Sequence, residues 1–216
     1  MRPSEVKVKI CGITNLEDAL SAVALGADAL GFVFAPESPR HISAIEAKKI
    51  ISKLPPFITT VAVITASEIE DIQNLIALSG VHLIQFHGDF PHKTLLHFSH
   101  RAIQVIQVKD ERSLKGFISA SGRAILLDTY HEKVAGGSGI AFNWNFATPA
   151  KQFGKVILAG GLTSNNVKTA IQTVQPYGVD VSSGVERQKG KKDPRKMRAF
   201  ISAAKEKGTG NAAATE

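Results

Sequence analysis

Short apolar runs rich in valine and isoleucine alternate with amphipathic segments from one end of the chain to the other. The runs are apolar at consecutive positions, which is typical of strands buried on both faces of a parallel sheet. We predict strands at residues 6–10, 29–34, 58–64, 82–86, 102–108, 124–127, 156–158 and 179–181. Between them, apolar residues recur at helical spacing in residues 16–25, 44–51, 69–78, 167–174 and 197–204.

The regular spacing of these elements predicts the fold class. Successive strands begin roughly 25 positions apart, which is the length of one strand–helix unit in a compact barrel. No Pro/Gly-rich linker or change of composition interrupts the series. We therefore predict a single-domain (β/α)8 TIM barrel with a closed eight-stranded parallel sheet over residues 1–207. An open doubly wound sheet is the alternative, although it usually has fewer units. Residues 208–216 are small and polar, and we predict a flexible tail there.

Composition narrows the class of protein further. The chain has 216 residues, of which 44% are hydrophobic and 21% charged, as in an ordinary folded domain. No apolar run approaches the roughly 20 residues of a membrane span, and the N-terminus leads into the first strand without a signal-like segment. Cys11 is the only cysteine, so an internal disulfide is excluded. These features predict a cytoplasmic protein without a membrane partner.

The net charge of +7 favours binding of anions, whether nucleic acid or a phosphorylated metabolite. Much of the positive charge falls within residues 187–198, where no aromatic residue offers a stacking platform for bases before Phe200. We interpret this segment as a solvated face. The predicted partner is a small phosphorylated substrate and not nucleic acid.

Two strand ends carry candidate acid–base residues. In barrels of this type, the ends of the strands and the loops after them form the active site. Cys11 stands at the end of the first strand, before Gly12, where a thiol with a lowered pKa can act as a general base. The alternative is a small buried hydrophobe. Asp128 follows the sixth strand, where it either faces the barrel mouth as a proton donor or caps the loop.

Other strand ends carry candidate substrate contacts. Arg40 follows Pro39 in the loop after the second strand, where its guanidinium can bind a carboxylate or phosphate or lie on the surface. The fourth strand ends in QFHG at residues 85–88. His87 is either catalytic or a polar side chain that lines the barrel mouth. We predict that Gln85 and His87 bind substrate.

Small residues follow the last three strands. They are Gly136 and Gly137 after the sixth strand, Gly160 and Gly161 after the seventh, and Ser182, Ser183 and Gly184 after the eighth. Glycine lets backbone N–H groups approach an anion closely, and barrels frequently bind phosphate after strands seven and eight. We predict a phosphate site there. The sequence offers no set of cysteine, histidine and carboxylate ligands for a metal, so we predict a reaction without a metal ion.

Several of these segments together resemble the phosphoribosylanthranilate isomerase family. The opening KICGIT at residues 9–14 and GVDVSSGVE at 178–186 are the most specific, whereas glycine pairs occur in many phosphate-binding barrels. The likeness continues through GADALGFVF at 26–34, SPR at 38–40, QFHG at 85–88, LLDT at 126–129, GGSG at 136–139, LAGGLT at 158–163 and GKKD at 190–193. The chain departs from the family pattern at residues 64–67 and 130–135.

The resemblance implies an Amadori rearrangement in tryptophan biosynthesis. Phosphoribosylanthranilate becomes 1-(2-carboxyphenylamino)-1-deoxyribulose 5-phosphate, without a cofactor. By family analogy Asp128 is the general acid that opens the ribose ring, Cys11 is the base that takes the C2 proton, and Arg40 contacts the anthranilate carboxylate. The backbone around Gly137, Gly161, Ser183 and Gly184 matches the phosphate cradle. The sequence predicts either a monomer or a homodimer.

Two rival functions are also compatible with the sequence. Other phosphate-binding barrels are one, but metal-dependent epimerases need histidine and aspartate ligands at several strand ends, and histidine-pathway isomerases are expected to carry aspartate where this chain has Cys11. A non-catalytic barrel that binds phosphorylated ligands or nucleic acid through residues 187–198 is the other. Retention of both Cys11 and Asp128 argues against such a loss of catalysis.

Overall fold

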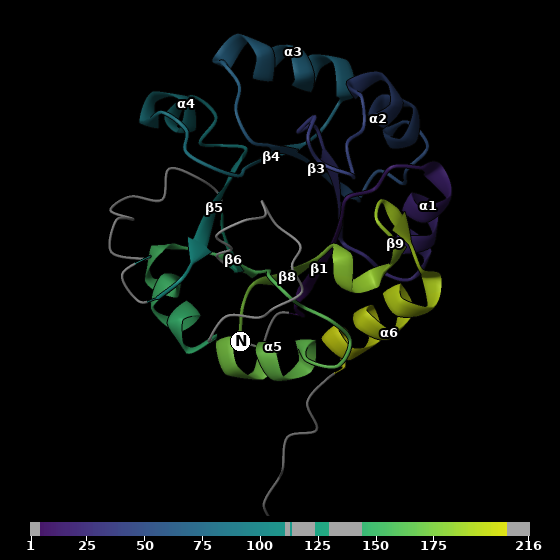
Figure 1. Ribbon diagram of the computed structural model, residues 1–216, viewed down its shortest axis with the longest axis vertical. Coiled ribbons are helices and arrows are strands. Elements are labelled where there is room, and N and C mark those ends of the chain that lie inside the picture. Colours follow the sequence, from purple (N-terminus) through teal and green to yellow (C-terminus); the bar gives the residue numbers. More distant parts are fainter. Residues whose placement is uncertain (1–4, 111–112, 114–123, 130–143, 207–216) are drawn as a thin grey trace, which may run out of the picture.

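The computed structural model describes residues 5–110, 113, 124–129 and 144–206, and it contains a closed barrel of eight parallel strands (Figure 1). The strands pair in chain order, and β1 closes the barrel against β8. They are β1 (Lys7–Cys11), β2 (Ala29–Val33), β3 (Thr59–Ile64), β4 (Leu83–Phe86), β5 (Ala102–Val108), β6 (Ala124–Thr129), β7 (Val156–Leu158) and β8 (Gly178–Val181). The predicted TIM barrel is confirmed, and its strand boundaries differ from the predicted ones by at most two residues.

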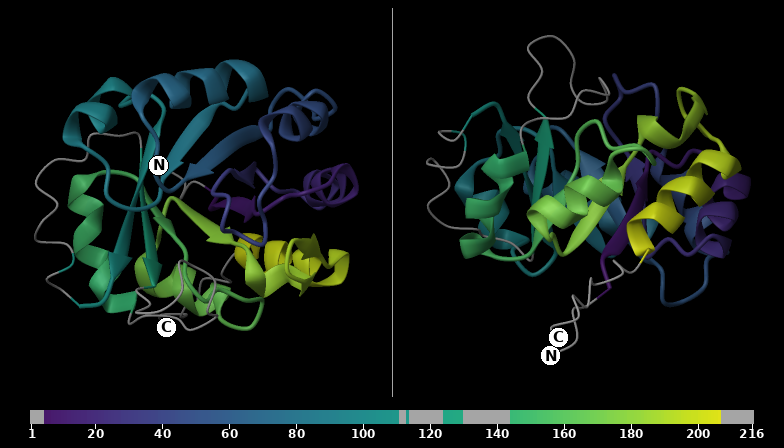
Figure 2. Two further views of the ribbon diagram at one scale, coloured as in Figure 1. Left: turned by 45° about the horizontal axis from the view of Figure 1, so that its top comes forward. Right: turned by 90° about the horizontal axis from the view of Figure 1, so that it is seen from below.

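Helices surround the barrel, as the further views in Figure 2 also show. They are α1 (Leu16–Ala24), α2 (Ala44–Ile51), α3 (Ile69–Ser79), α4 (His92–His97), α5 (Val167–Val174) and α6 (Pro194–Lys205), with the 3-10 helix η2 (Trp144–Phe153) before β7. The five predicted helices are present. The sequence did not predict α4 and η2, which are too short or too irregular to show an amphipathic repeat.

Alternation along each strand separates an outer core from the barrel interior. Val8 and Ile10 on β1 are buried against the helices, in the same cluster as Phe200 of α6. The alternate positions, Lys9 and Cys11, point into the barrel because successive side chains of a strand face opposite sides. The barrel interior is apolar where Leu126 packs with residues of neighbouring strands. Along β1 it is polar, because Lys9 is buried there.

Local sequence signals fix the helices next to the barrel mouth. Ser43 and Glu46 form a capping box at the start of α2. Asp193 accepts hydrogen bonds from the backbone at the start of α6, where Pro194 occupies the first turn. These caps set where the loops after β2 and β8 end, and those loops contribute to the candidate site.

The connection between β8 and α6 is more ordered than the sequence predicted. It forms a short 3-10 turn, η3 (Ser183–Val185), and a two-stranded hairpin of β9 (Glu186–Gln188) and β10 (Lys191–Lys192). The interpretation of residues 187–198 as a solvated face holds for Arg187, Arg195 and Arg198, which are exposed. It is wrong for Lys192, which is completely buried. Among the described residues, no helix combines the length and the apolar character that a membrane span requires.

Candidate active site

A cavity of about 420 Å³ lies at the carboxyl ends of the strands. Its walls carry most of the residues that the sequence singled out: Cys11, Arg40, His87, Asp128, Gly160, Gly161, Ser182, Ser183 and Gly184. A larger hollow of about 670 Å³ lies at the opposite end of the barrel, where Thr59, Leu83 and Ala124 stand near the starts of their strands. Barrel enzymes use the carboxyl end for catalysis, so the smaller cavity is the candidate active site.

Cys11 lies in an apolar part of this cavity wall. It is 7% exposed and packs with Val33, Ala35 and Val63. Burial raises the pKa of the thiol above its ordinary value, and the positive charge of Lys9 opposes that rise. The thiol is therefore protected from bulk water, while its ionisation depends on nearby cations.

Asp128 approaches the same cavity from β6, on the other side of the barrel from β1. Its Oδ1 atom accepts a hydrogen bond from the backbone N–H of Thr129 at 2.8 Å. The end of β7 runs close to it: Gly160 has φ +77°, and a Cβ there would meet the Thr129 hydroxyl and lie 2.9 Å from Asp128 Oδ1. Only glycine allows this close approach. The carboxyl group is thus oriented by its own strand and covered by the next.

The turn after β8 has the features of an anion site. Ser182 precedes η3, and the first N–H groups of a helical turn, here those of Ser183 and Gly184, have no partner within the turn. The Ser182 hydroxyl is buried and has no hydrogen-bond partner among the residues that the structure describes. Gly161, in the loop after β7, lines the same cavity. The remaining predicted phosphate residues, Gly136 and Gly137, lie outside the described residues.

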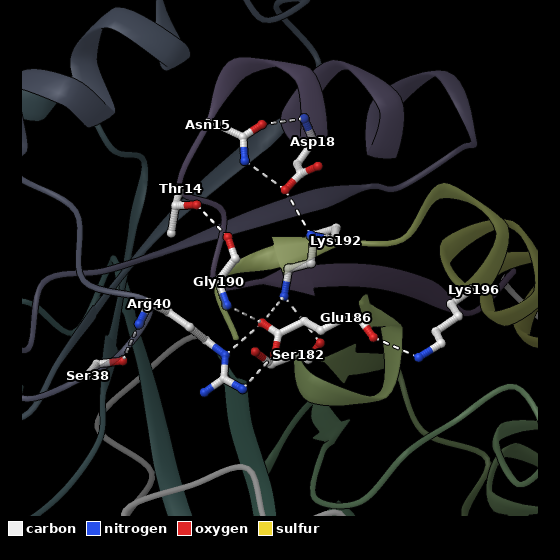
Figure 3. A network of polar contacts seen from close by, with 10 residues as sticks. All are labelled: Thr14, Asn15, Asp18, Ser38, Arg40, Ser182, Glu186, Gly190, Lys192 and Lys196. Carbon is white, nitrogen blue, oxygen red and sulfur yellow. Dashed lines mark hydrogen bonds and ion pairs between the residues drawn. The ribbon is translucent and has the colours of Figure 1, made fainter. Parts of the chain in front are cut away.

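Arg40 is held along one edge by Glu186 (Figure 3). The Nε and Nη2 atoms of Arg40 donate to the two carboxylate oxygens of Glu186, both at 2.8 Å. The same carboxylate accepts hydrogen bonds from Lys192 Nζ at 3.0 Å and from the Gly190 N–H at 3.3 Å. A guanidinium has five N–H donors, so those that Glu186 does not use can meet an anion in the cavity.

Two cations share the one carboxylate in this network. Burial by itself would raise the pKa of Glu186, but Arg40 and Lys192 outweigh it and hold that pKa below its ordinary value. Burial lowers the pKa of Lys192, against the influence of Glu186. With both cations protonated, the network carries one net positive charge beside the cavity. This charge favours an anionic substrate group or a thiolate.

Gln85 and His87 occupy different places. His87 lines the cavity, and its Nε2 lies 3.5 Å from Gln107 Nε2. Gln85 is buried inside the barrel beneath the cavity, where its Oε1 accepts a hydrogen bond from Lys9 Nζ at 3.0 Å. The structure thus brings His87, but not Gln85, to the cavity wall. Thr65, in the segment that departs from the family pattern, also lines the cavity.

Sequence reasoning missed four residues that organise the site: Lys9, Asp180, Glu186 and Lys192. Lys9 and Asp180 interrupt apolar strands that meet at the closure of the barrel, where they are register partners. A pair of opposite charges inside buried strands was the available signal. Glu186 and Lys192 had no such signal, because their partnership depends on the hairpin that joins them.

The fold and the site together define a class of enzyme. The thiol of Cys11 and the carboxyl group of Asp128 approach a single cavity from different strands, with an anion-binding turn beside them. Within the part of the chain that the structure describes, no three His, Cys, Asp or Glu side chains cluster as metal ligands. Such a site can move protons between neighbouring carbon and oxygen atoms of a phosphorylated substrate. The class is an acid–base isomerase built on a phosphate-binding (β/α)8 barrel.

Comparisons with known proteins agree with this class. The family model for N-(5'-phosphoribosyl)anthranilate (PRA) isomerase matches residues 8–203. The N-(5'-phosphoribosyl)anthranilate isomerase of Geobacter metallireducens is 48% identical over 200 residues, which cover 93% of this chain and 99% of the relative. The chain belongs to the phosphoribosylanthranilate isomerase family.

Solved structures give the same result. The phosphoribosyl anthranilate isomerase of Thermotoga maritima is 41% identical, with a TM-score of 0.86 over 93% of this chain and 98% of that one. A second structure, of a phosphoribosyl anthranilate isomerase in complex with reduced 1-(o-carboxyphenylamino)-1-deoxyribulose 5-phosphate, is 40% identical, with a TM-score of 0.81 over 93% and 98% of the two chains.

Proposed function

We propose that this isomerase converts N-(5'-phosphoribosyl)anthranilate into 1-(2-carboxyphenylamino)-1-deoxyribulose 5-phosphate, the Amadori step of tryptophan biosynthesis, with Asp128 as general acid and Cys11 as general base. The observation that carries the proposal is that these two groups line one cavity from strands on different sides of the barrel. The relative that binds the reduced product supports the choice of substrate.

The first half of the reaction opens the sugar ring. Asp128 donates its proton to the ribose ring oxygen, the bond from C1 to that oxygen breaks, and the nitrogen lone pair forms the C1=N bond. The resulting iminium ion accepts electrons at C1, so no external electron sink is needed. Positioned acid catalysis of this kind contributes roughly 10²–10⁴-fold to the rate.

The second half moves the C2 proton. The thiolate of Cys11 removes it, and the electron pair of the C2–H bond forms the C1=C2 bond while the nitrogen recovers its lone pair. The enolamine then tautomerises to the ketone, with a proton added at C1 and lost from the C2 hydroxyl. The aldehyde carbon is reduced and C2 is oxidised within one molecule, so neither a cofactor nor a metal is required.

The remaining residues bind the two anionic ends of the substrate. The phosphate fits the turn of Ser182, Ser183 and Gly184, where the buried hydroxyl of Ser182 gains a partner. Gly160 and Gly161 approach from the neighbouring loop. The anthranilate carboxylate fits the unused donors of Arg40, with His87 on the wall nearby.

The proposed function also implies an oligomeric state, a location and a set of partners. The protein acts as a monomer or homodimer in the cytoplasm on a small phosphorylated substrate, without nucleic acid or membrane partners. The related Thermotoga maritima enzyme is described as dimeric. Sedimentation of the purified protein measures which of the two states it adopts.

A turnover assay tests the roles. Phosphoribosylanthranilate is generated in situ, in buffer with a metal chelator, and loss of its fluorescence is followed. Cys11→Ala and Asp128→Asn should each lower kcat by roughly 10²–10⁴-fold. Asp89→Asn, which changes an exposed acid after β4, is the matched control and should keep wild-type turnover. No turnover by folded wild type, or full turnover by Cys11→Ala, would refute the proposal.

A further inference from the structure

Lys9 is a buried cation to which the proposed reaction gives no role. It stands in the middle of β1, two positions before Cys11, so both side chains face the barrel interior. The Lys9 side chain is 5% exposed. A buried ammonium is costly unless it is paired, so a lysine at this position needs a structural or chemical reason.

Two strands fix the position of the Lys9 ammonium. Its Nζ donates to Asp180 Oδ1 on β8 at 2.9 Å and to Gln85 Oε1 on β4 at 3.0 Å. Lys9 and Asp180 are register partners, so the hydrogen bonds between β1 and β8 hold them side by side. The ammonium is therefore held in place by the barrel and not by a mobile loop.

The third neighbour of Lys9 Nζ, besides Asp180 and Gln85, is the thiol of Cys11. Gly31 on β2 is the register partner of Cys11. A Cβ at Gly31 would lie 2.7 Å from Cys11 Sγ and 3.0 Å from Lys9 Nζ, so both atoms lie against this one glycine. Any side chain at Gly31 would force the thiol or the ammonium away. The glycine thus allows the cation and the sulfur to be neighbours.

We infer that Lys9 is a positioning residue for the active site: its ammonium, held by Asp180 and Gln85 beneath the cavity, stabilises the thiolate form of Cys11. The inference rests on the proposed function in one respect, since it explains how the thiol becomes the general base. It also makes a claim about the thiol itself, which is measurable without turnover.

Charged groups face Cys11 from several elements. Lys9 on β1, Asp180 on β8, Lys192 on β10 and Arg40 after β2 interact with the thiol. Asp128 on β6, His87 after β4, Glu37 after β2 and Lys189 between β9 and β10 line the same cavity. Burial raises the pKa of the thiol, and Lys9 opposes burial more strongly than Lys192 does. Burial would also lower the pKa of Lys9, but Asp180 and Cys11 outweigh it and raise that pKa, so Lys9 stays charged at neutral pH.

The test uses the fact that Cys11 is the only cysteine of the chain. Ionisation of the thiol is followed by the ultraviolet absorbance of the thiolate and by the rate of alkylation with iodoacetamide, with Cys11→Ser as blank. Lys9→Met should raise the pKa of the thiol by about 1–3 units, the range expected for loss of a neighbouring opposite charge. Alkylation at neutral pH should slow about tenfold for each unit.

Two further variants separate charge from structure. Lys7→Met, on the same strand but with a side chain that is 46% exposed and pairs with Asp28, should leave the titration unchanged. Because Lys9→Met leaves Asp180 without its partner, Lys9→Met/Asp180→Asn removes both charges and protects the fold. Its thiol should titrate above the wild type but below Lys9→Met, since the opposing carboxylate is gone. A wild-type titration in the double variant would overturn the inference.

The same variants distinguish this inference from the proposed function. If Lys9→Met shifts the thiol titration and moves the acid limb of the kcat/KM profile in parallel, both stand. If the titration shifts but Cys11→Ser keeps turnover, the role of the thiolate as base is wrong while the influence of Lys9 stands. If Cys11→Ser is inactive and the titration does not move, the inference about Lys9 falls and the proposed function survives.

Discussion

Two buried ion clusters lie close together in this barrel, and they differ in what holds them. The interior cluster consists of Lys9, Gln85 and Asp180, all on barrel strands. The mouth cluster consists of Arg40, Glu186 and Lys192, which come from the loop after β2 and the hairpin after β8. The strands set the geometry of the interior cluster, whereas the mouth cluster depends on its own contacts.

The clusters also differ in charge. The interior cluster pairs one cation with one anion, so it can influence a neighbouring thiol without attracting a substrate into the barrel core. The mouth cluster has two cations on one carboxylate and retains positive charge for an anion from solution. The difference fits the roles proposed above, in which the interior cluster stabilises the Cys11 thiolate and the mouth cluster attracts the anionic substrate. The mouth cluster also ties the hairpin to the loop after β2.

The largest effect is expected when the mouth cluster loses its only anion. Glu186→Gln leaves the fully buried Lys192 without a counter-charge and should lower the free energy of unfolding by about 3–5 kcal/mol. Glu206→Gln makes the same chemical change in an exposed pair with Lys168 and should cost at most about 1 kcal/mol. Urea unfolding measures both. Equal losses would contradict a structural role of the mouth cluster.

The same stabilisation should depend on pH. The pKa of Glu186 in the folded protein lies below its ordinary value of 4.5. A carboxyl group with a lowered pKa stabilises the fold above its unfolded pKa, and this stabilisation is lost as the pH falls through the folded pKa. The difference in unfolding free energy between wild type and Glu186→Gln should therefore be constant near neutral pH and shrink below about pH 4. A difference that persists at low pH would show that charge is not its source.

The fold and part of the site were predicted from the sequence, whereas the two clusters were not. The barrel was predictable because each strand is a continuous apolar run and each intervening segment repeats at helical spacing. Cys11, Asp128 and the residues after β8 were predictable as site candidates because the fold places the carboxyl ends of all strands around one cavity. The short helices α4 and η2 have too few turns for such a pattern.

The mouth cluster was not predictable for a physical reason. Lys192 lies in a run of basic residues whose other members are mostly exposed, and nothing local distinguishes it. Its burial requires the hairpin to fold back so that its backbone N–H reaches Asp18 on α1, a contact across 174 positions of the chain. Gln85 poses a different problem. Its place on a strand indicates an inward side chain, but it does not show how deep in the barrel that side chain lies.

A smaller effect, on substrate binding, is expected when the guanidinium of Arg40 in the mouth cluster is replaced. Arg40→Lys keeps the charge but loses the planar set of donors that reaches Glu186 and a substrate carboxylate together. KM for phosphoribosylanthranilate should rise about 10–100-fold, equivalent to loss of roughly 1.4–2.8 kcal/mol of binding, with a smaller change in kcat. Arg101→Lys, at the opposite end of the barrel, should leave both constants unchanged. A fall in kcat with KM unchanged would place Arg40 on the reacting atoms instead.

The smallest effect should come from the neutral member of the interior cluster. Gln85→Met removes one hydrogen bond to Lys9 Nζ but leaves the ion pair with Asp180 in place. If Gln85 only orients the ammonium, KM should stay within about twofold of the wild type, while the thiol titration of Cys11 moves slightly upward. The sequence instead assigned Gln85 to substrate binding. A large rise in KM with an unchanged thiol titration would support the substrate-binding role. It would also show that Gln85 has no part in how Lys9 acts on the thiol.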